Sequence, residues 1–293
     1  MQILKNIILS VVLGLGGLNA HSLWVNSFES FHHKPGHTTV GIGWGHSMPI
    51  DDMPNSVNGK VKVESFTITT PNGKTTKLKL PKSKIEDPSI KTNELDVYNN
   101  DLALQKIALK KDSPKGVYTI KANSKATFYT QYIDKNNKKR LKFKSKDKLK
   151  NVKKVLWSVQ HQTFAKTYLT LGEWSEQKAL GDSLEIIPKT DLSNVKVGDF
   201  IELEVLFYGE PLNMSPNSME FITAYSNTFG QGKGFSLFSA IKNAKAGFIV
   251  QSPGQWIINC HHKQNVTKDG VLKEFYGKVD NIFHSASLTF NVK

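Results

Sequence analysis

Short stretches that alternate apolar and polar residues dominate the chain, and they predict β-strands. Residues 61–70 (VKVESFTITT) are rich in β-branched side chains, and a PNGK turn leads from them into a second such stretch at 75–80. β-branched residues on both sides of a Gly turn are typical of a hairpin. Residues 102–109 and 117–120, on either side of an SPKG turn, predict another hairpin, and residues 128–133 predict a further strand. Helical periodicity is weak throughout.

The second half of the chain repeats this organisation. A strand is predicted at 184–188 (LEIIP), another at 200–207, and residues 285–292 alternate apolar and polar side chains. Between the halves, residues 155–171 carry aromatic and aliphatic side chains that predict a bridging strand rather than a flexible linker. Short strands separated by Pro/Gly turns are typical of sandwiches. We therefore predict an all-β protein of two immunoglobulin-like antiparallel β-sandwich domains joined by a bridging strand.

The first twenty residues have the pattern of a secretory signal peptide. Lys5 supplies a positive charge, residues 7–15 are apolar but shorter than the roughly 20 residues needed to span a bilayer, and Ala20 is a small residue before the predicted cut. We expect cleavage after Ala20 and a periplasmic protein. The predicted organisation is a signal peptide at 1–20, an N-terminal β-sandwich at 21–150, a bridging segment at 151–180 and a C-terminal immunoglobulin-like β-sandwich at 181–293.

Positive charge is concentrated in one segment. The chain carries a formal net charge of +14, yet residues 135–154 alone contain ten lysines and Arg140 against Asp147. Basic residues alternate there with Leu141 and Phe143, which predicts a strand with one solvated face whose lysines discourage edge-to-edge pairing. The alternative is a docking surface for an anionic lipid or polysaccharide of the envelope. Outside the cytoplasm, nucleic acid is not expected as a partner.

His21 is the main candidate for chemistry. Cleavage after Ala20 would make it the first residue, and its α-amine and imidazole could then close on one metal ion. His46 lies among glycines that allow the backbone to turn an imidazole inward. Imidazole suits copper, nickel, zinc and iron. The single cysteine, Cys260, excludes an intramolecular disulfide and the cysteine pairs of structural zinc sites.

The other candidate ligands depend on strand geometry. His261 and His262 are adjacent on a predicted strand, so they face opposite sides and at most one readily joins a given site. Asp51 and Asp52 follow His46 in a loop, where they could lend a carboxylate or simply face solvent. The remaining histidines are expected in a surface turn or as packing residues: His32, His33, His37, His161 and His284.

Motifs along nearly the whole mature chain resemble the bacterial DUF4198 family. In the first half they are AHSLW at 20–24, KPG at 34–36, GHSMP at 45–49 and PNGK at 71–74. In the second half they are LEIIP at 184–188, VKVGD at 195–199, LFYGEPL at 206–212 and SPGQW at 252–256. Singly each motif is weak, but their number and order make the resemblance fairly specific.

The resemblance implies an exported β-rich protein associated with nickel or cobalt uptake systems. It assigns the family's histidine after the signal cut to His21, its Gly-His pair to His46, and its histidine-bearing strand to His261 and His262. Ser22 stands where the family more usually has an acidic residue, which would remove a carboxylate near the site.

Three functions are compatible with these features. We expect a non-enzymatic periplasmic accessory protein that binds a divalent transition metal ion, nickel or cobalt with copper as an alternative, and serves membrane metal importer components. One alternative is an envelope adhesion or scaffold module without metal. The other is a copper redox enzyme with a histidine brace. The sequence leaves the oligomeric state open.

Overall fold

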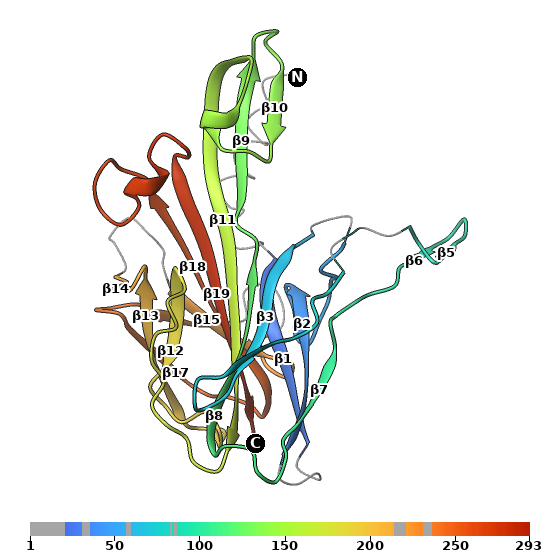
Figure 1. The fold of residues 1–293 in the computed structure, drawn as a ribbon, viewed down its shortest axis with the longest axis vertical. Helices are drawn as coiled ribbons and strands as arrows, with labels where there is room; N and C mark the ends of the chain where they lie inside the picture. The colour runs from blue at the N-terminus through green and yellow to red at the C-terminus, as the bar shows by residue number, and fades with distance from the viewer. Residues whose placement is uncertain are drawn as a thin grey trace.

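One long β-sheet runs through the protein and forms the centre of the fold (Figure 1). The computed structural model describes residues 21–30, 36–56, 60–82, 84, 87–213, 221–230 and 236–293. The predicted signal peptide, His32 and His33 therefore lie outside the described residues. The central sheet has ten strands, which are β3 (Val63–Thr69), β4 (Thr75–Lys77), β8 (Gly116–Ser124), β9 (Thr127–Asp134), β10 (Lys139–Lys142), β11 (Val152–Leu171), β15 (Phe221–Ser226), β16 (Leu237–Ala240), β18 (Gly254–Asn265) and β19 (Asn281–Val292).

Two smaller sheets cover opposite faces of the central sheet. The first contains β1 (Ser22–Ser30), β2 (His37–Gly45) and β7 (Gln105–Ala108), and the second contains β12 (Leu184–Pro188), β13 (Phe200–Phe207), β14 (Glu210–Pro211) and β17 (Lys245–Ile249). The hydroxyls of Ser287 and Thr289 on β19 donate to carbonyls of β1, at 2.6 Å each. Successive residues of a strand face opposite sides, so Leu288 points away from β1 and packs in the other core. A small hairpin of β5 (Ile90–Lys91) and β6 (Asp96–Val97) projects from the body.

These three layers enclose two large hydrophobic cores. The core beneath β1 and β2 includes Val25, Ile42 and Ile120, each fully buried. The larger core on the opposite face includes Leu203, Trp256 and Leu288, also fully buried. These clusters correspond broadly to the first and second halves of the chain, as two sandwiches would, but they share the central sheet.

Strand β11 belongs to both cores. It runs for 20 residues and contributes Ala165 and Leu169 to one core and Phe164 and Tyr168 to the other. It lies within the segment expected to bridge the halves. Its pairing with β19 is parallel, whereas the sequence predicted antiparallel neighbours and the other described strand pairs are antiparallel. No tight turn joins β11 to β19, so no hairpin imposes the antiparallel direction.

The all-β class is confirmed, and the predicted first hairpin is present as β3 and β4. The second predicted hairpin is wrong, because β7 pairs with β2 while β8 pairs with β3 and β11. Val117 and Tyr118 pack in different cores, so β8 needs apolar cover on both faces and finds it only in the central sheet. Helical turns in the described residues are short, at Lys146–Lys148 and Lys273–Phe275. None of the helices described is long and apolar enough to span a bilayer.

A buried ion pair joins β11 to β12. The Lys166 ammonium lies 3.3 Å from a carboxylate oxygen of Glu185, and their side chains are only 5% and 2% exposed. The same carboxylate accepts hydrogen bonds from the backbone N–H groups of Leu180 and Gly181 at 2.9 Å. Burial lowers the pKa of Lys166, and the negative charges of Glu185 and Asp182 oppose that shift. Removing either member would leave the other charged and buried without its partner.

Lys166→Met should therefore lower the free energy of unfolding by about 3–5 kcal/mol. The double variant Lys166→Met/Glu185→Gln should be more stable than the single variant, because it also removes the stranded carboxylate charge. Urea unfolding measures both losses. A loss below about 1 kcal/mol for the single variant, or a double variant that is no more stable, would contradict this account.

Three histidines of the central sheet are held neutral by burial. Burial lowers the pKa of His161 and of His261 to about 4, and that of His284 to about 3. Neighbouring imidazoles add to the effect, since His261 acts on His161, and His161 and His262 act on His284. The folded protein therefore resists protonation at positions where the unfolded chain accepts it.

Stability should fall as the solution is acidified from pH 6.5 towards pH 4. In this window the unfolded state binds more protons than the folded state, because these histidines titrate near 6.5 when unfolded. Each contributes up to about 1.4 kcal/mol per pH unit. Urea unfolding at several pH values measures the slope, and His161→Gln should reduce it. A free energy of unfolding that stays constant or rises as the pH is lowered over this range would contradict the prediction.

Candidate functional site

The structure brings His21 and His46 together. His21 directly precedes β1 and His46 directly follows β2, and these strands pair antiparallel with Ser22 opposite Gly45. The two imidazoles consequently meet at the open end of the strand pair, with ring centroids 4.3 Å apart and planes tilted by 47°. Trp44 stacks on the His21 ring at 5.2 Å and 15°, which fixes the plane of that imidazole. Two of the four predicted ligands are thus neighbours.

Two carboxylates from the following loop hold these histidines. Nε2 of His21 lies 2.8 Å from an Asp52 carboxylate oxygen. Asp51 accepts the backbone N–H of His46 at 2.8 Å, and its other oxygen lies 3.7 Å from Nδ1 of the His46 ring. The sequence left the role of this acidic pair open. The sequence did contain a signal for this role, however, because the two aspartates follow the Gly-His motif within the same loop.

Asp52 is an ionised acceptor for His21. Partial burial acts to raise the pKa of this carboxyl group, but hydrogen bonds from the Met53 backbone N–H and from His21 outweigh it and lower the pKa. An ionised carboxylate cannot donate a proton, so Nε2 of His21 carries the hydrogen of this bond. In a neutral imidazole the lone pair then lies on Nδ1, the ring nitrogen closer to the main chain.

Glycines and a tryptophan determine the path of the loop. A side chain at Gly43 would overlap the indole of Trp24, so only glycine allows this close approach. The Trp24 indole N–H donates to Asn26 Oδ1 at 3.0 Å and to the Pro49 carbonyl at 3.2 Å, and Asn26 donates to the same carbonyl at 2.9 Å. The Tyr225 hydroxyl donates to the His46 carbonyl at 3.0 Å. The loop is therefore fixed to both β1 and the central sheet.

His261 and His262 lie on opposite faces of β18, as their adjacency predicts. His261 pairs opposite Ser285 and stacks on Phe283 at 6.1 Å and 17°, on the face that β1 covers. Its Nδ1 is buried and has no hydrogen-bond partner. His262 faces the other way, with Nε2 3.1 Å from Gln264 Oε1 and its ring edge against Phe207 at 4.3 Å. Only His261 shares a face with the His21 strand.

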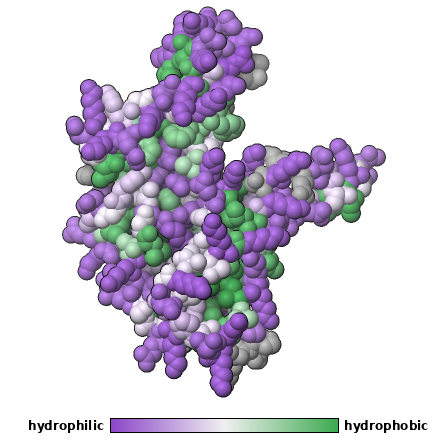
Figure 2. Space-filling model, viewed as in Figure 1, coloured by the Kyte–Doolittle hydropathy of each residue, from purple (hydrophilic) through white to green (hydrophobic). Residues whose placement is uncertain are grey.

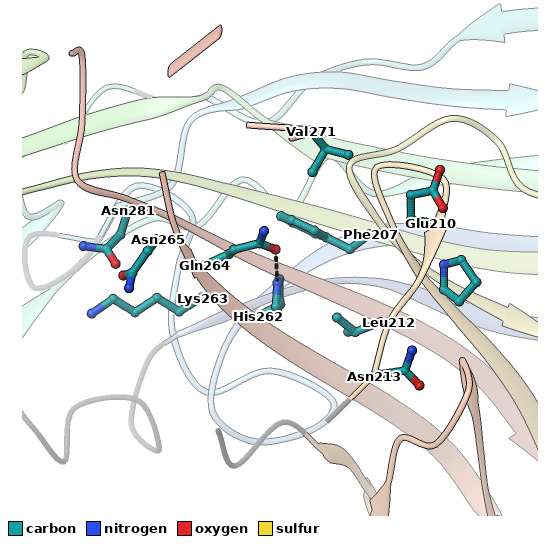
Figure 3. A pocket seen from close by; sticks show the side chains of 11 residues that line it. Phe207, Glu210, Leu212, Asn213, His262, Lys263, Gln264, Asn265, Val271 and Asn281 are labelled. Atoms are coloured by element: carbon teal, nitrogen blue, oxygen red, sulfur yellow. Dashed lines mark hydrogen bonds between the residues drawn. The ribbon is translucent and has the colours of Figure 1, made fainter. Parts of the chain in front are cut away.

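His262 lines a separate cavity of about 730 Å³ (Figure 3). Four amide side chains are among the residues that line this cavity, and Figure 3 shows His262 joined to one of them, Gln264, by a hydrogen bond. In the part of the chain that the structure describes, no group of three or more His, Cys, Asp or Glu side chains is arranged to hold a metal ion. A complete site at His21 would need donors beyond these side chains, and the α-amine predicted for the mature protein is one.

Comparison with known proteins places the chain in a family. The family model described as "Domain of unknown function (DUF4198)" matches residues 18–264. The chain belongs to the DUF4198 family. This match spans most of the chain and includes all four predicted ligands, so the family expected from the motifs is confirmed. A search of curated proteins found no match. The DUF4198 description itself assigns no activity.

Gly45→Ala should destabilise the loop that carries the acidic pair. Gly45 has a φ of +132°, and a Cβ there would overlap the Asp51 carboxylate. Gly73 is the matched control, since its φ is +83° but nothing lies within 4 Å of its added Cβ. Backbone strain alone costs about 1–3 kcal/mol, so Gly45→Ala should lower the free energy of unfolding by more than Gly73→Ala does.

Removing the carboxylate separates overlap from strain. Asp51→Ala introduced together with Gly45→Ala should restore part of the lost stability, because the overlap disappears while the backbone strain stays. Urea unfolding of the unaltered protein, of the single variants Gly45→Ala and Asp51→Ala and of the double variant completes a double-mutant cycle. Equal losses at Gly45 and Gly73, with no coupling to Asp51, would show that the carboxylate does not depend on this glycine.

Proposed function

We propose that this DUF4198 protein is a periplasmic accessory protein for transition-metal uptake, exported with a signal peptide that is cleaved after Ala20. The mature N-terminal His21 and His46 bind a divalent ion, nickel or cobalt with copper as an alternative, and the protein passes it to membrane metal importer components. The metal is cargo, and the function requires no chemical turnover.

The hydrogen bond between Asp52 and Nε2 of His21 carries this proposal. It directs the lone pair of the imidazole to Nδ1, and the α-amine exposed by cleavage after Ala20 belongs to the same residue. Amine and Nδ1 can then close a chelate on one ion. Carboxylates that bind the far nitrogen of a ligating histidine orient its ring and raise its basicity, which is the relation of Asp52 to His21.

His46 supports the proposal as a second imidazole beside the first. The tilt between the two rings lets their nitrogens approach one ion without stacking. Three nitrogen donors suit nickel, cobalt and copper better than calcium or magnesium, which prefer oxygen. His261 is the better further candidate on β18, because it lies on the face covered by β1 whereas His262 lies on the other.

Titration calorimetry on correctly cleaved protein tests the proposal, with the N-terminal residue verified by mass spectrometry. We expect near-stoichiometric binding of nickel, cobalt or copper. One extra alanine before His21 should weaken binding, because it converts the His21 amine into an amide and so removes the chelate formed by that amine and Nδ1, while it leaves every side chain intact. Asp52→Asn should weaken binding by about 10–100-fold. His262→Gln is the matched control for His261→Gln and should leave binding unchanged.

Each result that contradicts the proposal points to a different conclusion. No binding tighter than about millimolar, roughly −4 kcal/mol, would reject the metal function and favour an envelope scaffold. Tight binding that survives the added alanine would contradict a chelate that needs the His21 amine. Reductant-dependent oxygen consumption by the copper-loaded protein would favour redox catalysis over metal delivery as the function.

A further inference from the structure

A basic arm projects from the body of the protein (Figure 1). It consists of β9, β10 and the first part of β11, which pair antiparallel from the tip of the arm downward. Asp134 pairs opposite Val152, so two chain reversals lie at the tip. We call residues 127–159 the basic arm. Its three strands extend beyond the part of the central sheet that the smaller sheets cover.

The charge of the arm is largely uncompensated. Residues 135–154 carry eleven basic side chains, and all but Lys146 are exposed. Among the described residues, two of the eleven form ion pairs with carboxylates: Arg140 with Asp134 at 3.0 Å, and Lys146 with Asp280. Figure 2 shows the arm covered mainly by hydrophilic residues, with a hydrophobic patch among them. Such a surplus attracts an anionic surface.

One face of the arm is apolar and aromatic. The strand register places Leu141 and Trp157 on either side of Gln131, and the Trp157 indole N–H donates to Gln131 at 3.1 Å. Phe143 packs edge-on against Tyr129 at 5.3 Å. Phe143 is nevertheless 69% exposed and Leu141 is 48% exposed. Large apolar side chains that stay exposed together with aromatic residues mark an interaction surface.

This face lies on the same side of the central sheet as β1. Along β11, Trp157 and Thr167 are an even number of residues apart and therefore point the same way. Thr167 pairs opposite Thr289, whose hydroxyl bonds to the Val25 carbonyl of β1. The aromatic face of the arm and the His21–His46 pair are consequently reached from one side of the protein.

We propose that the basic arm docks on the surface of an anionic phospholipid bilayer. Lys139, which has the strand parity of Leu141, and the lysines of the turns at the tip bind the phosphate headgroups. Phe143 and Leu141 insert at the boundary with the acyl chains, where Trp157 and Tyr129 place their polar atoms near the headgroups. An anionic polysaccharide fits less well, because Phe143 and Leu141 offer it no hydrogen bond. Docking in this way orients the His21 side of the protein towards the membrane.

Co-sedimentation of the mature protein with vesicles tests the docking. Vesicles of phosphatidylglycerol with phosphatidylethanolamine provide the anionic surface, and phosphatidylcholine vesicles provide the neutral one. We expect binding to the anionic vesicles alone, weakening as salt is raised. The variant Lys135→Gln/Lys138→Gln/Lys139→Gln should weaken binding at least tenfold. Its matched control is Lys106→Gln/Lys110→Gln/Lys111→Gln, at lysines that are also exposed, and it should bind as the unaltered protein does.

Insertion is tested separately from charge. Phe143→Ser should weaken binding about tenfold or more, and Trp157 fluorescence should shift to shorter wavelength when the unaltered protein binds. Phe238→Ser, at a phenylalanine that is 56% exposed on β16, is the control and should have no effect. Equal binding to neutral vesicles, equal losses in the control variants, or binding to alginate but to no vesicle would overturn the proposal. None of these outcomes depends on metal binding.

Discussion

The row of polar side chains on β19 that holds β1 determines where the candidate site lies. The carbonyls of Leu23 and Val25 point at the central sheet, where they would be buried without partners, and Ser287 and Thr289 supply the hydrogen bonds. Asn291 does the same for Ser27 at 3.2 Å. A buried carbonyl left unpaired costs about 1–3 kcal/mol, so this row fixes both the position and the depth of β1. Because His21 directly precedes β1, its main chain is fixed as well.

From that fixed strand the site is assembled by short-range effects. Antiparallel pairing brings His46 beside His21, and Gly43 and Gly45 of β2 make room for the Trp24 indole and the Asp51 carboxylate. The loop then returns Asp52 to Nε2 of His21. The result is a histidine held by packing on one ring face and by a carboxylate at one nitrogen, which leaves its other nitrogen on the side of the main chain. The basic arm, on the same side of the sheet, would present this site to a membrane surface.

Local patterns predicted most of the strands, since alternation and turn residues are local properties. They did not predict partners that are distant in sequence: β7 joins β2, and β11 pairs in parallel with β19. Residue types predicted His21 and His46 as ligands, and the structure brings these two rings together. Adjacency correctly separated the faces of His261 and His262. The Asp52 contact could not be derived, because it depends on how the loop after Gly45 returns across the strand pair. The aromatic face of the arm could not be predicted either, since its residues come from three strands and from Phe143, which follows β10.

The protonation pattern of the His21 ring tests the account most directly. Long-range ¹H–¹⁵N spectra of correctly cleaved, ¹⁵N-labelled protein at neutral pH distinguish the two tautomers, and addition of zinc, a diamagnetic ion with affinity for imidazole, reports which nitrogen binds metal. We predict a hydrogen on Nε2 in the metal-free protein and a metal-induced shift at Nδ1. In Asp52→Asn the preference for the tautomer with the hydrogen on Nε2 should be lost. A hydrogen on Nδ1 in the metal-free protein, or a metal shift confined to Nε2, would contradict the proposed chelate.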